Sequence, residues 1–475
     1  MKKLATVFLL VIMGLGATLR TYKLHEPLGD WHSWRQADTA SVAREYVKAG
    51  KIDLLHPQYH DLSSIPSGLD NLAGWRFVEF PLRDALHAQL VMWFPSVGLV
   101  EWGRIISIVA STLTIGLIYL VVTYLSGSRA GLFSALIFAI LPYNIYYGRV
   151  ILPEPMLVLF MLLSLYAFFR AWDSGKPKWW LATLVALATT LLFKPTGAVI
   201  LLPMFGYGLG SLGKISIRNT IFALLLPLLA FVPYLLWRRY LAAFPEGIPA
   251  SSWLFNGNGI RLKGAWFRWL FGERLGKMIL GYWGLLPLGF GLHRLGGKLK
   301  ETLVYGGLLL GSLTYMAVIA TGNVQHDYYQ IQIMPTVAIL VGLGIDYMLT
   351  LSKGFKLVTT TILIVTSLSL MLALSWYELQ GFFWVNNRAM VQAGIELDAI
   401  SPKDALVIAP YMGDTAFLFQ TNRRGWPIGG AIEFKINSGA SYYVTTTKDA
   451  EYQDLVSKYT LVKDTDQFSI IKLSK

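Results

Sequence analysis

Long apolar segments recur along most of this chain, and they constrain its fold more than any other feature. Many approach the roughly 20 consecutive apolar residues that a helix needs to cross the ~30 Å hydrocarbon core of a bilayer. Hydrophobic residues make up 54% of the 475 residues and charged residues only 15%, against about a quarter in ordinary soluble domains. The sequence therefore predicts a polytopic α-helical membrane protein.

The apolar runs predict about eleven transmembrane helices. The first run follows Met1-Lys2-Lys3 but precedes no convincing small-x-small cleavage site, so we interpret it as a retained helix and not as a secretory signal. The predicted spans are 4–20, 105–125, 130–147, 154–171, 180–194, 196–212, 219–237, 278–293, 303–320, 331–350 and 356–376.

The connections between these runs differ in charge, and the difference predicts their orientation. Basic connections collect on the cytoplasmic side of membrane proteins. This bias accounts for the net charge of +13, which in a soluble chain would suggest nucleic acid binding. With an odd number of spans, the C-terminus then lies outside. The basic connections are "SGSR" (126–129), "RAWDSGKPK" (170–178), "KISIR" (214–218), "HRLGGKLK" (293–300) and "SKGFK" (352–356).

Two segments do not fit a simple pattern of spans. Residues 82–97 have nearly the length of a short span but contain Arg83, Asp84 and His87, so we expect a helix lying in the membrane interface. Counting this segment as a span would turn every later basic connection outward. Residues 238–277 are external in this scheme yet strongly basic. Either the topology differs there, or this loop meets an anion.

The last part of the chain has a different pattern. Short runs at 404–410, 441–447, 459–463 and 468–473 predict strands between helical segments. We therefore expect two domains. Residues 1–378 form a transmembrane domain with a large first external loop at 21–104, and residues 379–475 form a small extracytoplasmic α/β domain.

Ionisable side chains collect near one end of the predicted spans. Such groups are costly near a bilayer unless they are paired or solvated, so they are often functional. The interiors of the spans are almost free of charge, whereas a transporter would need polar groups near the midplane. The pattern predicts a cavity at the outer surface for a substrate with a lipid tail and a polar head. The residues at this end are Asp30, Arg35, Asp38, Glu79, Arg149, Glu154, Lys194, His326 and Asp327.

These residue types suit the transfer of a group from a lipid phosphate. Arg and Lys would bind the phosphate, Arg with bidentate bonds, and a carboxylate would accept the proton of an attacking hydroxyl group. Trp31, Trp34 and Trp75 would offer flat faces to a sugar. The alternatives are structural: a helix cap or an Arg partner for Asp30, belt positions for the Trp residues and the tyrosines of "HDYYQ", a mutual ion pair for Arg149 and Glu154, and snorkelling for Lys194.

A series of motifs over residues 1–350 resembles the membrane glycosyltransferases of the GT-C superfamily, of the protein O-mannosyltransferase and aminoarabinose lipid A transferase type. The individual motifs are loose, but their order and spacing are fairly specific. They are "DWHSWRQADTASVARE" in the first loop, "EFPLRDAL" (79–86), "YYGRVILPEPMLVLF" (146–160), "LLFKPTGAVILLP" (191–203) and "HDYYQIQIMP" (326–335).

The resemblance implies an inverting transfer from a polyprenyl-phosphate-linked sugar donor to an acceptor outside, such as lipid A, a glycan or a protein. It also implies a catalytic Asp on the first external loop. Alignment of the following helix places the Asp-Glu pair of the mannosyltransferases at Arg35 and Gln36, neither of which is a base. "GDWHSWRQ" resembles the Gly-Asp-aromatic start of the loop in lipid-linked-oligosaccharide glucosyltransferases, so Asp30 is the first candidate and Asp38 the second.

The resemblance also implies roles for other residues at the outer end. Arg149, Lys194, Arg35, His326 and Tyr328 would bind the phosphate-bearing donor head. The acceptor or sugar would contact Glu154, Glu79, Trp31, Trp34 and His32. Some relatives bind a divalent cation, but no clear ligand spacing occurs here, and we expect no obligatory metal or other cofactor.

The expected location is the cytoplasmic (inner) membrane of a prokaryote, with the site on the extracytoplasmic side and membrane lipids around the spans. No nucleic acid partner is expected. Two alternatives remain open. One is a lipid-linked glycan ligase or polymerase with a pyrophosphate donor, which the basic loop at 238–277 favours. The other is a non-catalytic transporter of lipid-linked glycans, for which midplane charges or inverted repeats would be the signal.

Overall fold

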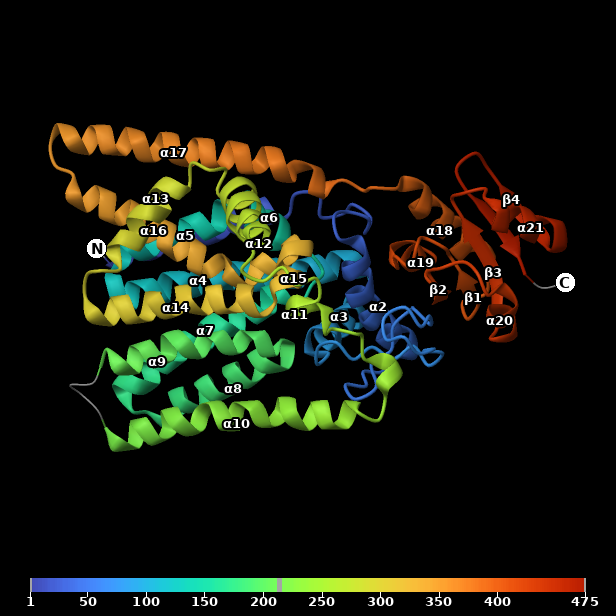
Figure 1. Cartoon of the computed structure of the whole chain (residues 1–475), viewed down its shortest axis with the longest axis horizontal. Coiled ribbons are helices and arrows are strands. Elements are labelled where there is room, and N and C mark those ends of the chain that lie inside the picture. Colours follow the sequence, from blue (N-terminus) through green and yellow to red (C-terminus); the bar gives the residue numbers. More distant parts are fainter. Residues whose placement is uncertain (1, 212–215, 474–475) are drawn as a thin grey trace.

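The computed structural model describes residues 2–211 and 216–473. Its larger part is a bundle of long helices that lie side by side along the long axis of the molecule (Figure 1). The main helices of the bundle are α1 (Lys2–Arg20), α4 (Leu99–Ser126), α5 (Ser128–Ile140), α7 (Glu154–Ser174), α8 (Pro177–Phe193), α9 (Leu201–Leu209), α10 (Ile217–Leu241), α13 (Leu285–Arg294), α14 (Leu299–Val318), α16 (Met334–Leu351) and α17 (Phe355–Leu379).

The predicted class of fold, a polytopic helical membrane protein with a small C-terminal α/β domain, is confirmed. Within the described residues, seven helices are long and apolar enough to cross a membrane, and three apolar helical segments are shorter. The number of spans, about eleven, therefore stays a prediction. One difference has a local cause. The expected span at 130–147 is divided into α5 and α6 (Pro142–Tyr147), because Pro142 has no N–H to continue the ladder and disfavours helical backbone at Leu141.

Small residues allow the central helices to approach closely. The segment that ends in α16 is the most enclosed, with 83% of its apolar window buried against 17% for the windows in α1 and α10. A Cβ added to Gly344 of α16 would lie 1.7 Å from the carbonyl oxygen of Pro287, and one added to Gly291 of α13 would lie 1.9 Å from that of Leu340. Helices in lipid associate through such close packing.

One end of the bundle carries the basic connections and the N-terminus (Figure 1). Asp346, near the end of α16, accepts hydrogen bonds at 2.5 Å from Arg129 at the start of α5 and from Arg294 at the end of α13. This pairing joins three of the connections that the charge pattern placed on one side. The other end carries the first loop and the C-terminal domain.

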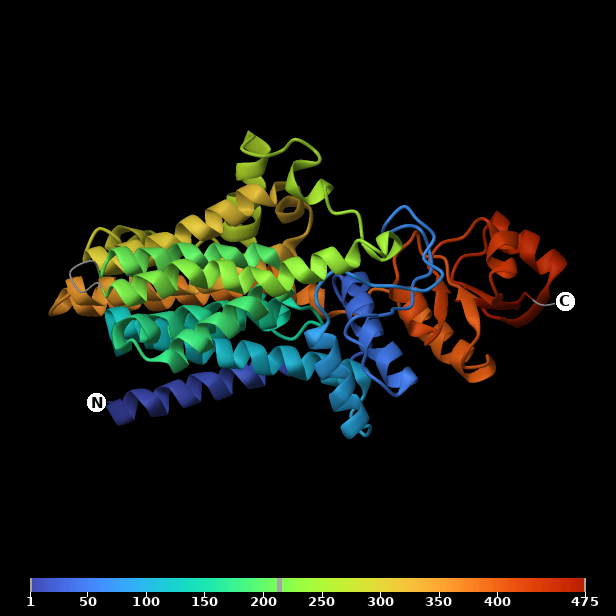
Figure 2. The same cartoon turned by 90° about the horizontal axis from the view of Figure 1, so that it is seen from below.

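The first loop contains α2 (Ser33–Ala49) and α3 (Leu82–Trp93), joined by an irregular segment. Figure 2 shows both helices steeply inclined to the long helices, at the end of the bundle. The 12 residues of α3 extend about 18 Å, too short for the hydrocarbon core. α3 is therefore no span, and its place in the membrane interface stays a prediction.

Short elements form the remaining connections at this end. Residues 245–279 contain no long apolar helix and lie beside the bundle (Figure 2). The elements are η1 (Pro195–Ile200), η3 (Pro245–Gly247), α11 (Trp253–Asn256), α12 (Gly264–Phe267), η4 (Arg268–Ile279), α15 (Ala320–Gln325), η5 (Asp327–Ile333) and η6 (Gln380–Phe383).

The C-terminal domain is a five-stranded sheet with helices on both faces. Its strand order is β2-β1-β3-β5-β4, with β1 parallel to β2 and β3 and the remaining pairs antiparallel. The strands are β1 (Leu406–Ile408), β2 (Arg424–Trp426), β3 (Ala440–Thr445), β4 (Thr460–Asp464) and β5 (Ser469–Lys472), and the helices are α18 (Arg388–Ile400), α19 (Ala416–Gln420), α20 (Ile432–Asn437) and α21 (Ala450–Lys458).

All four strands predicted in this domain are present, although each is shorter than or slightly shifted from the predicted run. The fifth, β2, has only three residues, Arg-Gly-Trp, too few to show alternation. One apolar cluster packs α18 and α19 against the sheet and another packs α20 and α21. The domain therefore has the three layers of an α/β sandwich.

Candidate functional site

Asp30 lies in a buried ion-pair network just before α2. Gln36 donates a hydrogen bond to its Oδ1 at 2.8 Å, and Arg149 donates to its Oδ2 at 2.6 Å. Arg104 of α4 approaches the same Oδ2 at 3.6 Å. Asp30 is 1% exposed and Arg149 is fully buried. The network joins the first loop to the bundle and occupies both oxygens of Asp30.

This arrangement bears on two predicted roles. Arg149 pairs with Asp30 and also donates to the carbonyl oxygen of Lys23 at 2.7 Å, so the suggested ion pair between Arg149 and Glu154 was wrong. The pairing of Asp30 with a neighbouring Arg is present. The catalytic role of Asp30 and the phosphate-binding role of Arg149 stay predictions, and in this conformation neither side chain is free to contact a substrate.

Asp38 is held at the junction of the first loop and the C-terminal domain. Its Oδ2 pairs with Arg76 at 2.8 Å, and its Oδ1 accepts a hydrogen bond from Thr415 at 2.7 Å and lies 3.5 Å from Nε2 of His60. Burial opposes the charge, but Arg76, His60 and Thr415 together lower the pKa of Asp38 to about 2. Asp38 is therefore a permanently ionised carboxylate with three partners.

A second set of charges meets beside Asp38. Arg35 of α2 donates to Oε1 of Glu79 at 2.6 Å, and Nζ of Lys194 lies 3.5 Å from the same oxygen. Lys194 also pairs with Glu154 at 2.5 Å. We call Arg35, Glu79, Lys194 and Glu154 the charged cluster. Its members come from α2, the segment before α3, the residue after α8 and the start of α7, so the fold gathers four segments that are remote in the sequence.

Glu79 and Glu154 each retain one oxygen outside these ion pairs. Burial opposes the charge of Glu79, but Arg35 and Lys194 hold its pKa below the ordinary value. Both contacts involve Oε1. In the described part of the chain, Oε2 of Glu154 is buried and has no hydrogen-bond partner. Such an atom is costly unless a water or a substrate hydroxyl satisfies it.

The charged cluster adjoins a small cavity of about 20 Å³, room for about one water. Three guanidinium groups and three carboxylates line it, with apolar walls from Phe80, Pro153 and Phe193. The charged residues are Arg35, Arg76, Arg83, Asp38, Glu79 and Asp84. Nε and Nη1 of the buried Arg83 have no hydrogen-bond partner in the described residues. Arg83 is nevertheless paired with Asp84, whose Oδ1 lies 3.6 Å from Nη1, so its charge is balanced within the protein.

A third group surrounds Asp327 at the start of η5. Its carboxylate accepts hydrogen bonds from Tyr147 at 2.5 Å and from Trp31 at 3.1 Å, and it pairs with Nε2 of His32 at 2.6 Å. Arg274 of η4 approaches it at 3.5 Å. One basic residue of the 238–277 loop, Arg274, is therefore paired with a carboxylate of the protein itself, and the side of the membrane on which the loop lies stays a prediction.

Aromatic rings connect the Asp327 group with the charged cluster. His326 stacks on Tyr328 with 5.5 Å between ring centroids and lies 5.9 Å from Trp34 and 5.8 Å from Trp253. Burial lowers the pKa of His326 to about 4, so the ring is uncharged at neutral pH. Trp31 is 39% exposed. The predicted sugar-facing Trp75 lies apart from this group and packs against His56, Phe77 and Phe244.

The structure brings most of the predicted residues together at one end of the bundle. Arg35, Glu79, Lys194 and Glu154 form one cluster, and Trp31, His32, Trp34, His326 and Tyr328 lie around Asp327. Sequence reasoning missed Arg76, His60 and Thr415 as partners of Asp38, and Tyr147 and Arg274 as partners of Asp327. The basic character of the loop at 238–277 could have pointed to Arg274. The position of Arg76, three residues before Glu79, could have pointed to Arg76. Thr415 had no such signal.

No group of three or more His, Asp or Glu side chains that would hold a metal ion occurs within residues 2–211 and 216–473. The expectation of no obligatory metal stays a prediction.

Comparison with known proteins gives a partial sequence match and extensive structural matches. A model of the family described as dolichyl-phosphate-mannose-protein mannosyltransferase matches residues 96–237. No curated protein matches the chain. The structure of ArnT from Cupriavidus metallidurans bound to undecaprenyl phosphate is similar with a TM-score of 0.66 and 13% identity, covering 98% of this chain and 97% of that one.

An archaeal enzyme has a comparable similarity. The oligosaccharyltransferase AglB from Archaeoglobus fulgidus, in complex with an inhibitory peptide and a dolichol-phosphate, matches with a TM-score of 0.63 and 11% identity. The match covers 94% of this chain and 70% of that one. The long helices, the first loop and the C-terminal domain of this chain all fall within the match to ArnT. The chain therefore shares its fold with ArnT over almost its whole length, and residues 96–237 resemble the protein mannosyltransferase family.

Proposed function

We propose that the chain is a glycosyltransferase that moves a sugar from a polyprenyl-phosphate carrier to an acceptor at the end of the bundle bearing the C-terminal domain. One observation carries the proposal: the charged cluster unites two cations and two carboxylates beside a polar cavity at the end of the spans. Support comes from the shared fold, since ArnT is bound to undecaprenyl phosphate and AglB to a dolichol-phosphate.

Arg35 and Lys194 are the proposed ligands of the carrier phosphate. Both contact Oε1 of Glu79 in the structure, and a phosphate oxygen entering the cavity would replace that carboxylate oxygen. Cations placed at the leaving group stabilise the charge that develops there in the transition state. The cavity of about 20 Å³ is too small for a sugar, so donor binding requires the surrounding segments to separate.

Glu79 is the proposed general base, in place of Asp30. Its pKa keeps it ionised at neutral pH, and displacement by the phosphate leaves its carboxylate beside the reacting groups. The acceptor hydroxyl attacks the anomeric carbon as the bond between that carbon and the phosphate oxygen breaks. The hydroxyl proton passes to Glu79, the electron pair leaves with the carrier phosphate, and the configuration inverts. Glu154, with its unpartnered oxygen, orients the acceptor.

The proposed active side is extracytoplasmic, in the cytoplasmic membrane of a prokaryote, because the opposite end of the bundle carries the basic connections. The acceptor is a hydroxyl group of the envelope, on lipid A, a glycan or a protein. The aromatic side chains of Trp31, Trp34 and Trp253 favour an acceptor or donor with a sugar face.

The test is mass spectrometry of membrane glycolipids from cells that express the wild-type chain, no chain, or Glu79→Gln. In cells with no chain and in cells with Glu79→Gln, we expect a polyprenyl-phosphate sugar to accumulate and one glycosylated product to be missing. Glu246→Gln, at the same end of the bundle, is the matched control and should behave as wild type. Identical glycolipids with and without the chain would refute the proposal.

A further inference from the structure

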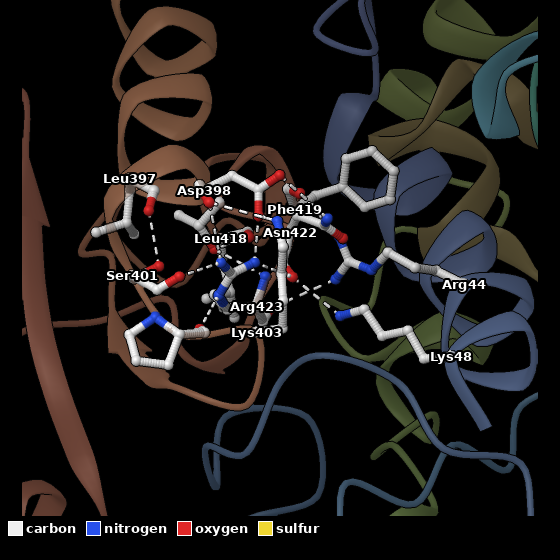
Figure 3. A network of polar contacts seen from close by, with 12 residues as sticks. Arg44, Lys48, Leu397, Asp398, Ser401, Lys403, Leu418, Phe419, Asn422 and Arg423 are labelled. Carbon is white, nitrogen blue, oxygen red and sulfur yellow. Dashed lines mark hydrogen bonds and ion pairs between the residues drawn. The ribbon is translucent and has the colours of Figure 1, made fainter.

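The C-terminal domain is docked firmly on the first loop. Arg44 of α2 donates to the carbonyl oxygen of Phe419 at 2.8 Å, and Lys48 donates to that of Asn422 at 2.9 Å (Figure 3). The ring of Phe419 lies under the Arg44 guanidinium at 4.8 Å. These contacts join the end of α2 to the turn between α19 and β2.

This turn is itself rigid. The fully buried side chain of Arg423 donates to the carbonyl oxygens of Pro402 at 2.7 Å and Ser401 at 2.9 Å and pairs with Asp398 (Figure 3). Arg423 therefore ties the turn to the loop after α18. A rigid turn fixed on α2 holds the start of α19 at a defined position against the first loop.

This position brings Thr415, the residue before α19, into contact with the candidate site. Its hydroxyl group donates to Oδ1 of Asp38 at 2.7 Å, and Asp414 accepts from the amide of Ala416 at 2.7 Å, which fixes the local backbone. Thr415 and Asp38 are 377 residues apart in the sequence. Both are at least 94% buried, so this hydrogen bond is shielded from water.

Asp38 in turn holds Arg76, a cation that lines the cavity. Its other oxygen pairs with Arg76 at 2.8 Å, and the Arg76 guanidinium lies over the ring of Tyr59 at 4.8 Å. Both Arg76 and Asp38 line the cavity. Asp38 stays ionised at neutral pH, and with both oxygens engaged by Arg76 and Thr415 it acts in this conformation as the counter-charge that holds Arg76 in place.

We infer that the C-terminal domain completes the donor site, with Thr415 as the positioning residue that fixes the Asp38–Arg76 pair at the cavity. The inference rests on the proposed function, because Arg76 matters there as a further cation for the carrier phosphate. It assigns the C-terminal domain a part in donor binding.

The experiment compares binding of undecaprenyl phosphate to the purified full chain and its variants. Thr415→Val removes the hydroxyl group and keeps the branched shape, and it should raise the Kd about tenfold, as expected for loss of a hydrogen bond to a charged group. Thr415→Ser restores the hydroxyl and should bind within about twofold of wild type. Thr445→Val removes a buried hydroxyl that hydrogen-bonds to Thr447 of the same domain and should bind as wild type.

A readout without ligand tests the positioning directly. Modification of Arg76 by phenylglyoxal, located by mass spectrometry, should be slow in wild type and Thr415→Ser and faster in folded Thr415→Val. Wild-type binding and unchanged Arg76 reactivity in Thr415→Val would overturn the inference alone. If the wild-type chain binds no undecaprenyl phosphate, the proposed function fails, and the role of Arg76 in donor binding fails with it.

Discussion

Asp30 and Glu79 are carboxylates of the same first loop, but their surroundings give them different chemistry. Asp30 has both oxygens occupied by Gln36 and Arg149, whereas Glu79 uses one oxygen for Arg35 and Lys194. A proton acceptor must be within hydrogen-bond reach of the substrate proton. In this conformation that condition favours Glu79, and Asp30 acts as the counter-charge of buried arginines.

Replacement of Asp30 should therefore affect stability first. Asp30→Asn leaves Arg149 and Arg104 without their carboxylate, and an uncompensated buried charge costs about 3–5 kcal/mol. We expect a lower midpoint of thermal unfolding in detergent, with no such change for Asp70→Asn, an exposed acid of the same loop. If Asp30→Asn unfolds like wild type but has lost transfer, Asp30 is the base and the assignment of Glu79 is wrong.

Asp61 gives the first loop a pH-dependent stability. Burial raises its pKa to about 7, above the ordinary ~3.9 of an unfolded chain. A raised folded pKa means that the favourable contribution is complete below pH ~4 and is lost as the pH rises through about 7. Asp61→Asn should remove this dependence, because Asn is neutral and keeps the oxygen that accepts from Ser63 at 2.8 Å.

The measurement is the thermal midpoint of both proteins at pH 5 and pH 8. Wild type should lose more stability than Asp61→Asn between these values. Equal losses would mean that Asp61 is ionised in the folded protein throughout, which would contradict the burial argument.

At the scale of helices and strands, much of the fold could be predicted from the sequence. Apolar runs locate the long helices because a chain in lipid must satisfy its backbone hydrogen bonds within each segment. The same rule does not predict which side chains of remote segments contact each other. The contacts of Asp30 with Arg149 and of Asp38 with Thr415 join segments 119 and 377 residues apart, and a single sequence carries no signal for them. Strand β2 is too short to show the alternation of apolar and polar residues by which a strand is predicted.

The close contact between α13 and α16 predicts a sharp difference between two glycines of one helix. Gly291→Ala would place its Cβ 1.9 Å from the carbonyl oxygen of Leu340, whereas a Cβ at Gly289 meets nothing within 4 Å. We expect Gly291→Ala to lower the thermal midpoint and the yield of folded protein. Gly289→Ala should be neutral or slightly stabilising, since Ala is the better helix former by about 1 kcal/mol.

Fluorescence-detected size exclusion of the two variants after heating measures this difference. Equal behaviour of Gly291→Ala and Gly289→Ala would show that the helices separate easily, and the bundle would then be less tightly packed than the structure indicates.

For the whole molecule, the two ends of the bundle differ in both charge and structure. One end carries short basic connections joined by Asp346, Arg129 and Arg294. The other carries the first loop, the charged cluster and the C-terminal domain (Figure 1). Because basic connections stay on the cytoplasmic side, the second end should face outward, and every proposed step of the reaction depends on that orientation.

Cysteine labelling tests the orientation, since the chain contains no cysteine of its own. Ser251→Cys and Ser457→Cys replace exposed residues at the end of the molecule that bears the C-terminal domain. Ser174→Cys and Lys353→Cys replace exposed residues at the opposite end of the bundle. In intact cells a membrane-impermeant maleimide should label the first pair alone. After permeabilisation it should label all four, which shows that the second pair is reactive. Labelling of Ser174→Cys from outside would show that the bundle has the opposite orientation. The charged cluster would then face the cytoplasm, which would contradict an extracytoplasmic transfer.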